Sequence, residues 1–416
     1  MGLRKRSINV ILIVFGLLLS FYYYRICNRV LAHYVGEKDH IDALIYLTFI
    51  AIVVFGMIRN SSLLKMPLAR IMLLFVIYLF FNGGVNFILG SISIQDYFKS
   101  FMWVMPFFCL LFFYKDDSRD EKIVFITMFI VSLICIAAGV MGMSWFALET
   151  VLTDDNDEIN EIVNIVAFSV ITLPFVILYK NVVIRLGLLA AISVVVLFSM
   201  RRIAVICLVL TIVIVILDLV KGQQVEIGKR RKRFKQLISI ALFVVICYFG
   251  YQLVTGELSA IWDNVIQRFS EIEEKGGSGR TDLWADVIRK LDDNSFIAWI
   301  FGNGFLGVNR LAGHTAAHNE FLEMLYDFGL VGLLLYTSMH AVMIKRIITL
   351  FRQKSELKLP YFVCYICFFF YSMLGNVIIY PQYAFSLFVF WGYAEKKLIL
   401  EKKMKKQKLL ALVQDT

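Results

Sequence analysis

The sequence predicts an all-α membrane protein that crosses the bilayer about twelve times. Of its 416 residues, 60% are hydrophobic and only 18% are charged, and the mean hydropathy is +0.75. A soluble domain of this length would be less apolar and would carry more charge. Repeated apolar runs of roughly 18–22 residues match the length of a helix that crosses a bilayer. We therefore expect a single membrane domain over residues 1–416, with no separate soluble domain.

The apolar runs give the predicted spans in chain order. The first run follows "RKR" and has no small-residue cleavage site after it, so we interpret it as an uncleaved span and not as a signal peptide. The predicted spans are residues 8–24, 42–58, 71–88, 100–114, 123–146, 161–179, 183–200, 203–220, 237–255, 321–344, 360–379 and 382–396.

Lysine and arginine are distributed unevenly between alternate connections. When the N-terminus is placed in the cytoplasm, 30 of the 42 Lys and Arg residues fall in cytoplasmic segments, which is the bias that orients membrane proteins. The loop 221–236 and the tail 397–416 are the most basic of these segments. We therefore predict that both termini are cytoplasmic. Orientation and anionic inner-leaflet lipid then explain the net charge of +10, and no nucleic-acid partner is implied.

One long connection, residues 256–320, is predicted on the outer side. Connections of this length are uncommon and often carry function. A flexible "GGSG" (276–279) precedes a short amphipathic helix, and a Gly-rich turn, "GNGFLG" (302–307), follows it. Such turns can cradle phosphate, but no βαβ unit surrounds this one, so a simple loop is favoured. The apolar face of the short helix consists of Trp284, Val287, Ile288 and Leu291.

Charged and titratable residues on the outer side are the candidates for chemistry. Arg201 and Arg202 lie in a tight turn between two spans, where they could bind phosphate or extend to lipid headgroups. Arg280 follows the "GGSG" break and is either a solvated charge or a planar, permanently charged phosphate ligand. His318 precedes an apolar run, where it could accept a hydroxyl proton near neutral pH or simply begin a helix.

Two other patterns favour ordinary structural roles. Cys364 and Cys367 form a C-x-x-C, but inside an apolar run with no second ligand pair they are interpreted as small apolar residues. The acidic "TDDND" (153–157) is interpreted as a solvated loop. The sequence thus predicts no metal site and no cofactor.

Four motifs together resemble a known family. In "HNEFLEMLYDFGLVG", His318-Asn319, nine residues and Gly329-x-x-Gly332 resemble the H-[NSQ]-x9-G-x-x-G signature of the bacterial O-antigen ligase and polymerase superfamily. "SGRTDLW" (278–284) is similar to that family's S-G-R-x-x-x-W, "GNGFLG" to its following Gly-rich turn, and "SMRRIAV" to its outer-end S-R-x-A segment. The motifs occur in the family's order over residues 199–332.

The resemblance implies a GT-C-like, metal-independent, inverting glycosyltransferase. Its donor would be a glycan on undecaprenyl diphosphate at the outer leaflet of the bacterial cytoplasmic membrane. The positions that carry over as catalytic are Arg202, Arg280 and His318, with Arg201 as the alternative to Arg202. The residues expected to contact substrate are Arg201, Trp284, His314 and Asn319. Gly329 and Gly332 are expected to seat their helix against a neighbour.

The sequence is compatible with three functions. A polymerase of O-antigen or capsule would join lipid-linked repeat units, and this is the function we favour. A ligase would transfer the glycan to lipid A–core or another acceptor. A polysaccharide flippase is the alternative from another class, although no half-repeat and few midplane charges are seen. The expected partners are the lipid-linked oligosaccharide, membrane lipid, and a chain-length regulator and flippase of the same pathway.

Overall fold

The computed structural model describes most of the chain, and every element in the described part is a helix. The residues described are 9–31, 40–115, 118–149, 169–199, 202–221, 280–311, 316–375, 377–378, 380 and 381–414. The predicted span 237–255 and the acidic loop 153–157 lie outside these residues. An all-α membrane protein is therefore what the chain forms, as its composition predicts.

The chain divides into two compact units, one of residues 1–207 with 291–416 and one of residues 208–290. The larger unit contains α1 (Val10–Leu31), α2 (His40–Asn60), η1 (Ser61–Lys65), α3 (Pro67–Ile88), α4 (Ile94–Met102), α5 (Met105–Phe113), α6 (Ser118–Glu149), α8 (Leu173–Leu178), α9 (Val182–Ser199), α14 (Phe296–Phe301), η3 (Val308–Arg310), α15 (Glu320–Arg352), α16 (Lys358–Leu374) and α17 (Pro381–Gln414). Helices α10 (Arg202–Lys221) and α13 (Arg280–Asp292) lie mostly in the smaller unit.

Five helices in the described part of the chain are long and apolar enough to cross a membrane, or six if the bent pair α4–α5 counts as one span. They are the helices at Val10–Asn28, Ile41–Lys65, Pro67–Ile88, Ser118–Met141 and Glu320–Arg352. Helices also occupy the predicted positions of spans in α9, α10 and α16, but these are shorter. The total of twelve spans therefore stays a prediction.

A break divides the predicted span 100–114. Helices α4 and α5 meet there at a bend of 53°. Pro106 stands in the first turn of α5, and its ring removes the backbone donor that would continue the preceding helix. All nine residues of α5 are buried, and Gly392 of α17 lies so close that an added Cβ would collide with the Phe107 carbonyl. The larger unit therefore has its core where α5 packs on α17.

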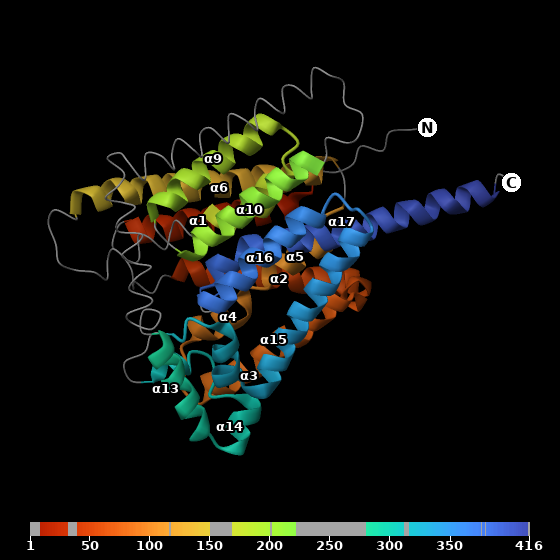
Figure 1. The fold of residues 1–416 in the computed structure, drawn as a ribbon. Coiled ribbons are helices and arrows are strands. Elements are labelled where there is room, and N and C mark those ends of the chain that lie inside the picture. Colours follow the sequence, from red (N-terminus) through yellow and green to blue (C-terminus); the bar gives the residue numbers. More distant parts are fainter. Residues whose placement is uncertain are drawn as a thin grey trace. The chain divides into compact units, whose positions relative to one another are not determined.

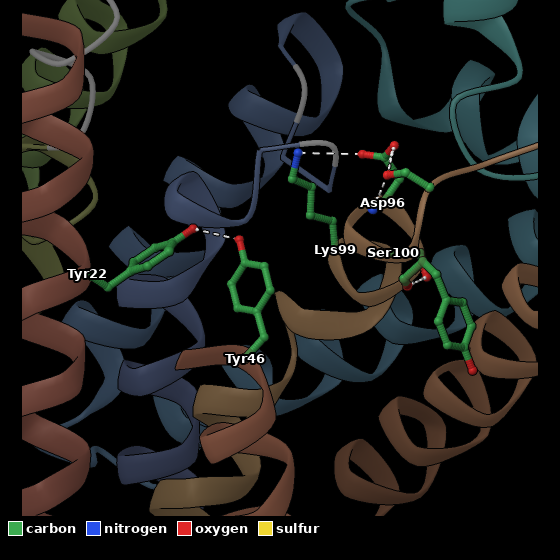
Figure 2. A network of polar contacts seen from close by, with 7 residues as sticks. Tyr22, Tyr46, Asp96, Lys99 and Ser100 are labelled. Atoms are coloured by element: carbon green, nitrogen blue, oxygen red, sulfur yellow. Dashed lines mark hydrogen bonds and ion pairs between the residues drawn. The ribbon is translucent and has the colours of Figure 1, made fainter. Parts of the chain in front are cut away.

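Polar side chains gather where α4 begins. Ser93 caps the helix by accepting a hydrogen bond from the Asp96 N–H at 3.2 Å, and its hydroxyl donates to the Asp96 carboxylate at 2.6 Å. The same carboxylate lies 3.5 Å from the Lys99 ammonium. Figure 2 shows Asp96 and Lys99 together with the paired hydroxyls of Tyr22 and Tyr46, which are 3.3 Å apart. The cap fixes the start of α4, so that the helix enters the bundle with its charged residues paired.

Helix α15 folds back on itself at Gly329, although the sequence predicts one span over 321–344. Gly329 has φ 64° and ψ −167°, which is not helical. The ring of Phe321 lies 5.2 Å from that of Tyr336 and 5.2 Å from that of His340. In a straight helix the fifteen residues from Phe321 to Tyr336 would span about 22 Å. We call Glu320–Phe328 the short arm and Leu330–Arg352 the long arm; Figure 1 shows α15 in light blue beside α3.

Candidate functional site

The short arm begins at an asparagine cap. The Asn319 side-chain oxygen accepts hydrogen bonds from the N–H groups of Phe321 at 3.0 Å and Leu322 at 3.2 Å. These two N–H groups belong to the first turn, which has no partners within its own helix. Asn319, a predicted substrate contact, therefore ends the loop and starts the helix with the same side chain.

His318, immediately before this cap, has a left-handed backbone. Its φ is 51°, a conformation that is uncommon for residues other than glycine and costs about 1–3 kcal/mol. On the preceding side, the Ala317 N–H donates to Glu323 Oε1 at 2.6 Å. On the following side stands the Asn319 cap. The imidazole is half-buried. The hydrogen bonds on both sides thus hold His318 in a strained backbone conformation. Residues with strained backbones cluster at functional sites.

Three carboxylates line one face of the short arm. Glu320, Glu323 and Asp327 follow i, i+3, i+7 spacing, so they lie above one another along the helix. Their exposed fractions are 0%, 1% and 2%. We call these three residues the acidic ladder. Buried carboxylates are costly unless they are hydrogen-bonded, so each member must find donors.

The donors come from backbone N–H groups of distant segments. Glu320 Oε2 accepts from Val377 at 2.6 Å and from Ile378 at 3.3 Å, in the connection between α16 and α17. Asp327 Oδ1 accepts from Val308 at 3.0 Å, after the Gly-rich turn. With the bond from Ala317, the acidic ladder holds three separate loop segments against one helix face.

Two oxygens of the acidic ladder have no hydrogen-bond partner among the described residues. They are Glu320 Oε1 and Glu323 Oε2, and both are fully buried. Buried polar atoms are nearly always paired, and an unpaired one costs about 1–3 kcal/mol. No group of three or more His, Cys, Asp or Glu in the described part of the chain is arranged to hold a metal ion. The two oxygens are therefore buried polar atoms, within one turn of Asn319, that lack a hydrogen-bond partner in the described part of the chain.

The Gly-rich turn packs against the bend in α15. An added Cβ on Gly329 would collide with the Ile300 carbonyl, and one on Gly302 would collide with the Asp327 carbonyl. The Asn303 N–H donates to the Tyr326 carbonyl at 3.0 Å, and the Gly304 N–H to the Asp327 carbonyl at 2.7 Å. These two N–H groups of the turn thus donate to carbonyls of the short arm, which agrees with the interpretation of the segment as a simple loop. Gly329 does seat its helix, against the end of the short helix α14 and the first residue of the Gly-rich turn.

Gly332 has a different neighbour from the one predicted. An added Cβ there would collide with the side chain of Phe328, one turn earlier in α15 itself. The second glycine of the motif therefore makes room for the fold-back of its own chain and not for another helix.

The first turn of α10 lies near the segment that Glu320 holds. Ile203 Cδ1 is 3.7 Å from the position of an added Cβ on Gly375, two residues before Val377. Ile203 directly follows Arg202, the first residue of α10. The structure thereby brings the start of α10, the connection after α16 and the start of the short arm into one region. Arg201 and His314 lie outside the described residues.

Residues 186–337 match the family model described as O-Antigen ligase. This match confirms the predicted resemblance to the O-antigen ligase and polymerase superfamily over that segment. The matched segment contains the Gly-rich turn, the strained His318 and the bend at Gly329. A comparison with curated proteins gives no match. The match does not support the flippase alternative, and it does not distinguish a ligase from a polymerase.

Two further residues that the superfamily resemblance selects lie in the second unit. Arg280 is the first residue of α13, and Trp284 follows one turn later; both are half-buried. The predicted apolar face of this helix is only partly correct, because Val287 is buried while Ile288 is 53% exposed. Leu291 is buried as well, so the buried face of α13 contains Val287 and Leu291, and Ile288 lies off it.

The described cysteines are all free and buried. Cys367 of the C-x-x-C makes a side-chain contact with Cys207 of α10. This agrees with the interpretation of Cys364 and Cys367 as small packing residues.

Sequence reasoning assigned no role to the acidic ladder. Its residues could have been noticed by their i, i+3, i+7 spacing in an otherwise apolar stretch. Their partners could not, because Glu320 and Val377 are 57 residues apart in the chain.

Proposed function

We propose that this protein is a membrane glycosyltransferase that polymerises a cell-surface polysaccharide, O-antigen or capsule. It transfers a glycan from undecaprenyl diphosphate to a sugar hydroxyl of another lipid-linked repeat unit at the outer leaflet. The observation that carries this proposal is the left-handed His318, held between the acidic ladder and the Asn319 cap inside the segment that matches the family model.

The proposed step is a direct displacement. The acceptor hydroxyl oxygen attacks the anomeric carbon, the bond from that carbon to the diphosphate oxygen breaks, and the configuration inverts. The hydroxyl proton passes to the His318 imidazole, which acts as general base. Undecaprenyl diphosphate leaves with the bonding electron pair. Arg280 and Arg202, or Arg201 in its place, stabilise the negative charge that grows on the diphosphate. Fixed guanidinium groups supply this stabilisation without a metal ion.

A ligase is the second candidate, because the matching family model is described as O-Antigen ligase. The bond broken and the roles of His318 and the arginines are the same in both reactions. Only the acceptor differs: a second lipid-linked repeat unit for a polymerase, and lipid A–core or another acceptor for a ligase.

The proposed setting is the bacterial cytoplasmic membrane. The distribution of Lys and Arg supports cytoplasmic termini and an outward-facing loop 256–320. The superfamily supports a GT-C-like arrangement of about twelve spans. A chain-length regulator and a flippase of the same pathway are the proposed partners.

Purified protein with defined lipid-linked repeat units tests the proposal. Oligomers formed from repeat units alone identify a polymerase, whereas product that appears only when lipid A–core is added identifies a ligase. His318→Asn and His318→Gly should reduce product by about 100-fold or more, because both residues tolerate the left-handed backbone and only the imidazole is lost.

A matched control for these variants is Arg289→Ala. Arg289 is exposed on α13 and forms an ion pair with Asp286 at 3.2 Å, one turn away on the same helix, so its loss should leave product formation unchanged. Wild-type product levels in both His318 variants would contradict the assignment. In cells, loss of a polymerase leaves single repeat units on the outer face, whereas loss of a flippase leaves them on the inner face.

A further inference from the structure

The short helix α14 exposes four large apolar side chains. Phe296 is 79% exposed, Ile297 70%, Phe301 49% and Trp299 39%. None of the six residues is buried, and none carries a charge. A few residues later the same chain turns inward, where Phe305 and Val308 are buried. The outward side of α14 is therefore an apolar surface of its own, separate from the core in which Phe305 and Val308 are buried.

Helix α14 is held in this position by α3. The Tyr78 hydroxyl donates to the Phe301 carbonyl at 3.0 Å and the Asn82 amide to the same carbonyl at 2.7 Å. Tyr78 also donates to the Phe328 carbonyl at 2.6 Å, at the end of the short arm. The exposed side chains of α14 thus lie on a fixed support beside the bend in α15.

The supporting helix has an exposed apolar surface of its own. Helix α3 is long and apolar enough to cross a membrane, and only 22% of its most apolar stretch is buried. In a membrane-spanning helix, such side chains face lipid. The exposed apolar residues in and just after the half of α3 that carries Tyr78 and Asn82 are Ile77, Phe80, Phe81, Val85, Ile88 and Leu89. Helix α14 is hydrogen-bonded to this half of α3 and exposes side chains of the same apolar kind.

We propose that α14 lies in the acyl region of the bilayer leaflet in which α3 ends, and that bilayer lipid covers its exposed face. A water-facing loop rarely exposes four large apolar side chains together. Trp299 fits this location, because indole rings are enriched at the membrane interface. The Gly-rich turn, which follows α14 directly, then lies at the level of the lipid headgroups. This inference does not depend on which reaction the protein catalyses.

Site-directed spin labelling in liposomes tests the location of α14. Ile297→Cys is labelled with a nitroxide, and its collision rates with oxygen, which concentrates in lipid, and with a water-soluble nickel chelate are compared. Ile88→Cys on α3, 83% exposed in the structure, is the lipid-facing control. Asp293→Cys, exposed just before α14, is the water-facing control. Labelled wild-type protein gives the background, since its described cysteines are buried.

The expected result is an oxygen-to-nickel collision ratio at position 297 that matches position 88 and is severalfold higher than at position 293. A ratio that matches position 293 would overturn the proposal. Spin–spin broadening at 297 that disappears on dilution with unlabelled protein would also overturn it, because a second copy would then cover the face. If Ile297→Cys does not elute as wild-type protein does, Phe296→Cys provides the same test.

Discussion

The two arms of α15 are held in place by different forces. The short arm, nine residues long, buries the acidic ladder and is fixed by backbone N–H groups of three loop segments. The long arm is fixed by a largely apolar stripe, by side-chain hydrogen bonds of Tyr336 with Ser372 and of His340 with Tyr365, and by the ion pair of Arg346 with Glu395. The buried residues of that arm are Gly332, Tyr336, Met339, His340, Met343, Ile347 and Leu350. They recur every three or four residues, which is the pattern of a helix packed along one side.

The difference shows how one helix can combine anchoring and chemistry. In the long arm, apolar packing and side-chain hydrogen bonds to α16 hold the helix along one side. In the short arm, directed hydrogen bonds fix the position and the backbone conformation of residues 317–319, which precede the helix. His318 is held within this segment. We therefore expect changes in the long arm to affect stability, and changes in the short arm to affect activity more than stability.

Gly329→Ala should have the largest effect, because it removes the bend that separates the arms. The backbone at φ 64° and ψ −167° is accessible essentially to glycine alone, and the added Cβ would collide with the Ile300 carbonyl. We expect a loss of about 4 kcal/mol or more, seen as loss of monodisperse protein on size exclusion in detergent.

The matched control is Gly187→Ala in α9, where an added Cβ meets nothing within 4 Å. Alanine inside a helix should there be favourable by about 0.5–1 kcal/mol. Equal melting temperatures for the two variants would mean that the bend at Gly329 is not needed for folding.

Breaking the ion pair of the long arm should have the next largest effect. Arg346 binds Glu395 of α17 with two hydrogen bonds, at 2.7 Å and 2.6 Å, and the Tyr361 hydroxyl donates to the same carboxylate at 3.1 Å. Arg346→Met leaves the Glu395 carboxylate buried without its cation, which should cost about 3–5 kcal/mol. The double variant Arg346→Met/Glu395→Leu should be more stable than Arg346→Met in thermal melting.

Activity separates this prediction from those on the short arm. Below their melting temperatures, both long-arm variants should keep wild-type activity per folded molecule. A large fall in activity without a fall in melting temperature would contradict the division of roles between the arms.

Glu323→Ala should reduce activity more than stability. It removes the acceptor of the buried Ala317 N–H, which should cost about 1–3 kcal/mol. It also frees His318 from its left-handed backbone, and a displacement of about 1 Å can cost 100-fold in rate. Product formation by purified protein, measured below the melting temperature, checks this.

Glu323→Gln is the matched variant, since its amide oxygen can still accept from Ala317. It should recover most of the lost rate. If Glu323→Ala and Glu323→Gln lose activity equally, the carboxylate acts in another way than by holding the loop before His318.

Asn319→Ala should have the smallest effect. Loss of the cap that receives the Phe321 and Leu322 N–H groups should cost about 1 kcal/mol. Asn319→Asp keeps an acceptor in the same place and should melt within about 0.5 kcal/mol of wild type. A decrease for Asn319→Asp as large as that for Asn319→Ala would assign the amide group a role beyond capping, such as the predicted substrate contact.

The sequence by itself determined the class of the protein and the segment that carries its site. Composition and run length predict an all-α membrane protein, because a bilayer constrains each helix separately. The spacing of His318, Asn319, Gly329 and Gly332 is likewise local, so it could indicate the superfamily without a structure.

The tertiary structure decided what those residues do. An apolar run through Gly329 predicts a single span, and only the positive φ and the close backbone of Ile300 show that the helix folds back there. The acidic ladder resembles a set of misplaced charges until its donors, Val377 and Val308, are known. Hydrophobic length is a property of one segment, whereas a bend and a buried carboxylate are stabilised by segments far away in the chain.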